Sequence, residues 1–180
     1  MAPFSKIAGA GLRRVGQFAR CEGGGPAAEF ALAAPIFIAL ILGTAQIAII
    51  YLANAYLETA AEDAARMVMT NQTTGMTASQ FQTALCQNIT TLFTCGNIMV
   101  SLSPATSTTS ISTAAPTFNA NGTLTNSLPY TQPTPGQIAV LQVLYQWPVI
   151  GAPLGFNFGN LGNGAYLMMS TQVFMVEQPS

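Results

Sequence analysis

The sequence predicts an α+β fold, in which a long N-terminal helix spans a membrane, continues into an exported helix and packs on a small antiparallel sheet. Residues 30–53 form 24 consecutive uncharged, mostly apolar positions. A membrane-spanning helix needs about 20 such residues, whereas a buried core helix typically has about 10–14. A helical repeat of small apolar residues follows this stretch, and alternating apolar residues near the C-terminus indicate strands.

The composition supports a membrane helix joined to an uncharged polar domain. Only 6% of the 180 residues are charged, against about 25% in an ordinary soluble domain. After Arg66 the only charged side chain is Glu177. The net charge of −1 gives no electrostatic reason to expect nucleic-acid binding. We expect a basic leader at 1–24, a long helix at 25–72 and an exported domain at 73–180.

Four basic residues before the apolar stretch predict its orientation. Lys6, Arg13, Arg14 and Arg20 place the N-terminus in the cytoplasm by the positive-inside rule, so the domain lies on the far side. A cleavable secretory signal is the competing interpretation, but its apolar core has about 7–15 residues. The longer stretch at 30–53 favours an anchor, within which Pro35 is expected to kink the helix.

The helix is expected to continue beyond the membrane to about Gln72. Apolar residues recur at helical spacing through this part, and they make a narrow stripe of mainly small side chains: Leu57, Ala60, Ala61, Ala64 and Val68. Two interpretations of this stripe stay open. It packs either on the protein's own domain or on the helix of a neighbouring subunit.

The exported domain shows the pattern of one short helix and several strands. Thr77 or Ser79 is a candidate N-cap for the helix. Alternation of apolar residues predicts strands at 98–102, 137–147 and 165–175, and composition predicts a loop at 103–117. In the best strand, 137–147, the odd positions from Ala139 to Trp147 share one face, while Gln142 and Gln146 lie on the other. The glycine-rich segment 151–164 reads as a hairpin connection.

Two of the three cysteines fall in the exported domain. Cys86 and Cys95 lie nine positions apart, and an oxidising compartment favours a disulfide between them. Cys21 lies in the leader, on the reducing side. Two thiols without any histidine make a metal site improbable. We therefore predict no metal and no cofactor.

The sequence offers no set of residues for catalysis. It has no histidine for a triad, and beyond Arg66 only Glu177 remains as an acid or base. No phosphate-binding glycine-lysine motif is present. We therefore expect a structural or binding protein and no enzyme.

The segment before the apolar stretch resembles the processing site of type IV prepilins. It reads GGGPAAEF from Gly23 to Phe30, after a basic leader. The resemblance implies that a prepilin peptidase cuts between Gly24 and Gly25, which places Glu29 fifth and Phe30 sixth in the mature chain. Tyrosine is the commoner sixth residue in that family, and the proline that follows Gly25 is a departure.

Further segments resemble the TadE-like family of the tight-adherence (Flp) pilus system. They are GPAAEFALAAP, AARMVMTNQ, LYQWPVIG and STQVFMVEQP. The resemblance implies a pilin-like fold and a minor pilin or pseudopilin in the bacterial inner membrane, with a periplasmic domain. It also implies contacts with the prepilin peptidase, other pilin-like subunits and components of the apparatus. The alternative is an uncleaved, single-pass binding protein that contacts other envelope components.

Overall fold

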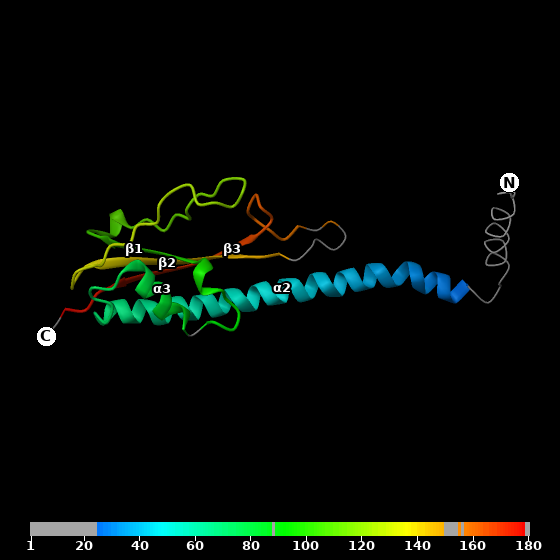
Figure 1. The fold of residues 1–180 in the computed structure, drawn as a ribbon, viewed down its shortest axis with the longest axis horizontal. Helices are drawn as coiled ribbons and strands as arrows, with labels where there is room; N and C mark the ends of the chain where they lie inside the picture. Colours follow the sequence, from blue (N-terminus) through cyan, green and yellow to red (C-terminus); the bar gives the residue numbers. More distant parts are fainter. Residues whose placement is uncertain (1–24, 88, 150–154, 156, 179–180) are drawn as a thin grey trace, which may run out of the picture. The chain divides into compact units, whose positions relative to one another are not determined.

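Figure 1 shows the computed structural model of the chain, which describes residues 25–87, 89–149, 155 and 157–178. The α+β fold is confirmed: a long N-terminal apolar helix accompanies a small three-stranded antiparallel sheet. The chain forms two compact units, Met1–Leu42 and Gly43–Ser180. The helix α2 spans Gly25–Met69 and contributes to both units. The predicted leader, 1–24, lies outside the described residues.

In the first unit, the described residues are helical throughout. Pro35 lies inside α2, and the helix continues through it. The apolar side chains of this segment are exposed, from Phe30 at 73% to Leu42 at 57%.

The second unit is built on the sheet. Strands β1 (Ile98–Ala105), β2 (Ile138–Trp147) and β3 (Tyr166–Met175) follow the order β1-β2-β3, and both pairings are antiparallel. The helices α2 and α3 (Ala78–Cys86) cover one face of this sheet, and the segment 106–137 runs over the other (Figure 1). Single 3-10 turns, η3 (Cys95–Asn97) and η4 (Thr108–Ser110), flank β1.

The main core lies between the helices and the sheet. Strand pairing puts the odd positions of β2 opposite the even positions of β1, as in Leu141 opposite Leu102. Directly opposite residues share a face, and these two side chains are fully buried in one cluster with Leu57 of α2 and Phe81 of α3. The helix α3 begins as predicted, because Thr77 caps it in a reciprocal capping box with Gln80.

The helix α2 ends at Met69, three residues before the predicted end. Asn71 adopts a left-handed conformation with φ 58, which stops the helix because a right-handed helix cannot continue through it. The Asn71 side-chain amide donates to the carbonyl of Glu177 at 3.1 Å, and the Glu177 backbone N–H donates to the Met69 carbonyl at 3.0 Å. The C-terminal tail therefore holds the end of α2.

The first strand is longer than predicted, since β1 continues to Ala105 into the expected loop at 103–117. Pro104 pairs with Ala139 of β2 and lacks an N–H for a sheet ladder. The position tolerates proline because even residues of β1 direct their backbone groups away from β2. Leu102, another even residue, shows this: its N–H donates to the Pro129 carbonyl at 2.9 Å, and its carbonyl accepts from the Thr131 N–H at 2.8 Å.

The second face of the sheet is also buried, which alternation in the sequence did not predict. Val140 and Leu144 are 3% and 0% exposed beneath the segment 106–137. Gln142 lies on the predicted side of β2, but it is only 8% exposed, and its Nε2 donates to the carbonyl of Ala114 at 3.1 Å. Gln146 donates in the same way to the carbonyl of Gly122. The two glutamines fasten the covering segment to the sheet.

The last strand is present, but its more regular apolar side does not face the helices. Pairing puts Met168 opposite Tyr145 and Ser170 opposite Val143, so the even positions of β3 point toward α2 and α3. Met168 is accordingly 1% exposed, whereas Met175 is 60% exposed. Register with β2 decides which side is buried.

Candidate assembly surface

The residues expected at the processing site fall at and before the first turns of α2. Gly24 lies outside the described residues. Gly25, Glu29 and Phe30 all belong to α2 and are exposed. Among the described residues, a Cβ placed on Gly25 would meet no heavy atom within 4 Å. Glu29 is the fifth residue of α2, just before the exposed apolar side chains begin.

The first unit exposes apolar side chains all around α2. They share exposures of 50% or more and are Phe30, Leu32, Ile36, Phe37, Ile38, Leu40, Ile41 and Leu42. By length and composition α2 is able to cross a membrane, and none of the described residues of the first unit is buried. A core helix of a soluble domain is mostly buried, so this segment suits lipid or the apolar helices of partners.

The small-residue stripe of α2 is buried within the second unit. Ala53, Ala61 and Ala64 have no exposed surface, and Leu57 lies with them in the core cluster. The stripe therefore packs on the protein's own domain, which decides between the two interpretations left open by the sequence. The charged side chains of this part of α2 are exposed instead: Glu58, Glu62, Asp63 and Arg66.

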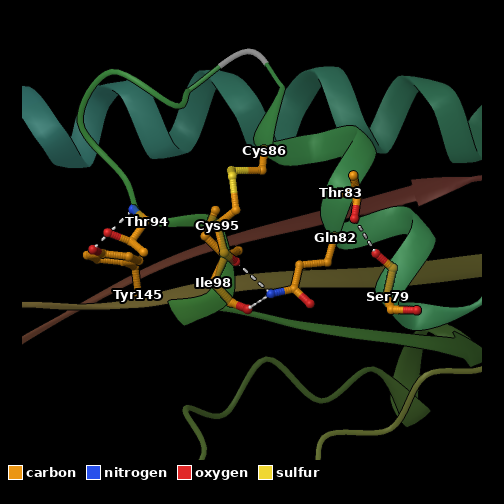
Figure 2. The surroundings of a disulfide bond; sticks show 8 residues. All are labelled: Ser79, Gln82, Thr83, Cys86, Thr94, Cys95, Ile98 and Tyr145. Atoms are coloured by element: carbon orange, nitrogen blue, oxygen red, sulfur yellow. Dashed lines mark hydrogen bonds between the residues drawn. A yellow bond between two sulfur atoms is a disulfide. The ribbon is translucent and has the colours of Figure 1, made fainter.

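A disulfide fixes the segment that follows α3. Cys86 and Cys95 are bonded, with their Cα atoms 5.6 Å apart. Figure 2 shows Gln82 of α3 reaching across this closure, where its Nε2 lies 2.7 Å from the carbonyl oxygens of both Cys95 and Ile98. Sequence reasoning missed Gln82, because nothing in its spacing marks it as a bridge between α3 and β1.

Phe93, in the segment that the Cys86–Cys95 disulfide closes, forms an aromatic cluster with side chains of the sheet. Phe93 meets Tyr145 edge-on, with ring centroids 4.9 Å apart, and lies 5.9 Å from Trp147. The Thr94 backbone N–H donates to the Tyr145 hydroxyl at 3.4 Å, as Figure 2 shows. These contacts tie the disulfide-closed segment to the C-terminal end of β2.

A second set of hydrogen bonds joins the turn after α2 to the segment 106–137. The Nε2 of Gln132 lies 3.1 Å from the carbonyl oxygen of Thr73 and 2.8 Å from the Tyr130 hydroxyl. The Tyr130 ring also packs on Phe81, with centroids 5.9 Å apart. Burial raises the pKa of Tyr130 above its ordinary value of 10.0, while the hydrogen bond from Gln132 opposes that rise.

Two hollows in the described part of the second unit are lined by uncharged side chains. One, of about 580 Å³, is lined by amides, hydroxyls and apolar groups that include Asn97, Tyr145 and Asn163. Another, of about 230 Å³, lies between α2 and the disulfide-closed segment, with Leu52, Tyr56 and Phe93 among its lining residues. Neither lining contains an acidic or basic side chain. Within the described ranges, no three cysteine or acidic side chains gather where a metal ion would be held.

Comparison with known proteins finds a match to the helical part of the chain. Residues 24–66 match the family model described as TadE-like protein, which confirms the resemblance predicted from the sequence over that stretch. This family is a structural family associated with the tight-adherence pilus. The matched stretch begins at the residue before α2 and ends at Arg66, before the sheet. No curated protein and no solved structure matches the chain.

Proposed function

We propose that this chain is a minor pilin or pseudopilin that supports assembly of the tight-adherence (Flp) pilus. In this proposal α2 anchors the protein in the bacterial inner membrane, with the N-terminus in the cytoplasm and the second unit in the periplasm. The protein acts through helix packing and protein contacts with other pilin-like subunits and components of the apparatus. A prepilin peptidase matures it by cutting between Gly24 and Gly25.

The observation that carries this proposal is that, in the part of α2 within the first unit, a carboxylate lies directly before an apolar surface. Glu29 is an exposed carboxylate that immediately precedes the exposed apolar surface running from Phe30 to Leu42. A carboxylate at the edge of a membrane helix is costly unless it reaches water or a partner. The match to the TadE-like family covers the same residues.

Cleavage would give Glu29 its partner. A cut before Gly25 creates an α-amino group, which is positively charged at neutral pH. The two groups are four residues apart, or about 6 Å along the helix axis. In a low-dielectric environment opposite charges attract strongly, so the carboxylate of one subunit neutralises the amine of the next. That pairing sets the register in which neighbouring helices pack.

The leader is tested by intact-mass measurement of the protein extracted from membranes of cells with the tight-adherence apparatus. We expect the mass of a chain that starts at Gly25 and that has lost two hydrogens to the cystine. A mass that still includes residues 1–24 would instead support the uncleaved, membrane-anchored binding protein. The same spectrum taken from cells without the peptidase provides the control.

The role of Glu29 is tested by comparing Glu29→Ala with Glu58→Ala. Both residues are exposed carboxylates of α2, but Glu58 lies in the second unit. We expect Glu29→Ala to be cleaved normally and yet recovered far less in cross-linked complexes with other pilin-like subunits, because its amine partner stays uncompensated. Glu58→Ala should assemble normally. Full recovery of Glu29→Ala in those complexes would contradict the proposed pairing.

A further inference from the structure

The outer edge of β3 is unpaired along most of its length. Leu102 of β1 directs its N–H and carbonyl away from β2, so its partner Leu141 directs the same groups toward β3. Because Leu141 pairs with Gln172, the even residues of β3 bond to β2, and the odd residues direct their backbone groups outward. Within the described part of the chain, four odd residues make no hydrogen bond through these groups: Met169, Thr171, Val173 and Met175. We call residues 169–175 the open edge of β3.

The opposite edge of the sheet, on β1, is covered by the chain itself. The outward groups of Leu102 bond the extended segment at Pro129 and Thr131. Tyr130, between these two residues, forms a parallel bridge with Leu102. Pro104 also faces outward and has no N–H that needs a partner. One edge of this sheet therefore already takes up an extended, uncharged segment as an added strand.

The start of β3 is protected, but the open edge is not. At the start, the Asn160 side chain takes the place of a strand: its Oδ1 accepts from the Leu167 N–H at 2.7 Å, and its Nδ2 donates to the Leu167 carbonyl at 3.4 Å. Natural proteins commonly protect sheet edges with lysine, proline or a bulge, and residues 169–175 contain no lysine, proline or glycine. An uncharged, unprotected edge of this kind is a template for another strand.

The side chains of the open edge also lack partners. Val173 and Met175 are 46% and 60% exposed, although both are apolar. Thr171 buries its Oγ1 without a hydrogen-bond partner among the described residues. On an added antiparallel strand, the Cβ of the residue opposite Thr171 would lie about 4.5–5.5 Å from the Thr171 Cβ, and a serine or threonine there would give this hydroxyl its partner.

We propose that the open edge of β3 binds an extended, uncharged segment of another protein chain, which adds to the sheet as a fourth strand. The free backbone groups recur at every second residue, about 6.8 Å apart, which is the spacing of an extended polypeptide. Seven residues of such a segment, about 23 Å, would cover the open edge. The segment is uncharged because the open edge has no charged side chain to compensate a charge buried against it.

A second copy of this chain fits the open edge less completely than such a segment. An antiparallel pairing of two β3 strands centred on Thr171 brings Met175 of one copy opposite Leu167 of the other. The backbone groups of Leu167 are already bonded to Asn160, so those of Met175 stay unpaired. A pairing centred one residue later puts Thr171 opposite Val173, whose side chain cannot form a hydrogen bond with the buried hydroxyl. We therefore assign the edge to a different chain.

The first measurement is amide hydrogen exchange of the full chain in detergent micelles, followed by NMR. We expect the amide protons of the odd residues of the open edge to exchange fast, and those of the even residues, which bond to β2, to exchange about 100-fold more slowly. Equal protection of odd and even residues would mean that this chain already covers its own edge. If that protection disappears on dilution, a second copy covers it. Either result overturns the proposal.

The second measurement is photo-cross-linking in the cells that naturally produce the chain. The photo-reactive residue benzoylphenylalanine replaces Met175 at the open edge, and Thr109, exposed in η4, serves as the control position. We expect a product with another protein from position 175 and not from position 109, and the attached site should lie in an uncharged segment. This product supports the proposal only if Val173→Pro lowers its yield about tenfold while Val173→Thr does not. The absence of a product, or a product between two copies of this chain, would overturn the proposal.

The two changes at Val173 separate backbone pairing from side-chain contact. Val173→Pro removes an N–H that faces the open edge, as Pro104 does on β1, so the sheet loses no hydrogen bond of its own. Its urea midpoint should stay near that of the unaltered chain, whereas Gln172→Pro removes a bond to β2 and should lower it. If Val173→Pro nevertheless unfolds, Val173→Lys replaces it, because it keeps the backbone and places a charge on the edge. A product that survives both variants, or that Val173→Thr also removes, would show that no strand is added.

Discussion

Removing the disulfide should weaken the second unit by an amount that its loop length predicts. The bond joins Cys86 and Cys95 across a sequence separation of nine. In the chain-entropy treatment, freeing a loop of that length destabilises the folded state by about 2.6 kcal/mol at 25 °C. Cys86 is also buried, at 1% exposure, so that replacing it by alanine adds a smaller loss of packing. The expected total is about 3 kcal/mol.

The assay is urea unfolding of Cys86→Ala/Cys95→Ala against the unaltered chain, followed by the emission of Trp147. That emission reports the right region, because Phe93 lies within the closed segment and its ring is 5.9 Å from Trp147. With a urea dependence of about 1–3 kcal/mol per molar, the midpoint should fall by about 1–3 M.

The control is Cys21→Ala, with all variants prepared in cells without the peptidase so that residues 1–24 are retained; it removes a thiol from the predicted leader and leaves the disulfide intact. Its unfolding midpoint should equal that of the unaltered chain. An unchanged midpoint for the double variant would refute the reasoning, since it would mean that the contacts of Phe93 and Gln82 alone hold the segment in place.

Three further changes test other parts of the second unit. Leu57→Ala should cost about 2–5 kcal/mol in urea unfolding because it empties a fully buried site, while Leu52→Ala, at a half-exposed site, should cost little. Gly162→Ala places a Cβ 2.6 Å from the backbone carbonyl oxygen of Ala120 and should cost about 1–3 kcal/mol, whereas Gly96→Ala meets nothing within 4 Å and should not lower the unfolding midpoint by a comparable amount. The raised pKa of Tyr130 gives stability that is present below pH 10 and is lost as pH rises through the folded-state pKa, so stability measured from pH 9 to 11 should fall more steeply than in Tyr130→Phe.

Local patterns predicted the parts of the fold that local physics decides. The capping role of Thr77 and the strand that became β2 follow from neighbours within a few residues. The end of α2 did not, because Asn71 adopts its conformation beside a tail 106 residues away. The burial of Gln142 likewise depends on Ala114, 28 residues distant in the sequence. Such contacts leave no period in the sequence for pattern analysis to detect.

Some features of the candidate site could also be predicted from the sequence, and one could not. The exposed carboxylate of Glu29 and the apolar surface after it were visible in the sequence, since both depend only on the helix and its composition. The boundary between the two units, at Gly43, was not visible in the sequence. Hydropathy continues smoothly to Ala53, although the second unit begins at Gly43 and Ile50 already belongs to its core. An apolar run indicates only that this part of the helix is excluded from water. Lipid and a protein core both provide such surroundings, so the run does not distinguish them.

The buried stripe of α2 restricts where neighbouring subunits attach. Ala61 has no exposed surface and belongs to the core cluster, so a larger side chain at this site must displace its neighbours. Ala61→Leu should therefore destabilise the second unit by about 1–3 kcal/mol in urea unfolding, whereas Ala55→Leu, on the exposed side of α2, should leave it unchanged. If Ala61→Leu instead left the unit's stability intact and abolished only cross-linking to other pilin-like subunits, the stripe would belong to an intermolecular interface. The expected result leaves the first unit and the exposed side of α2 as the helical surfaces for assembly.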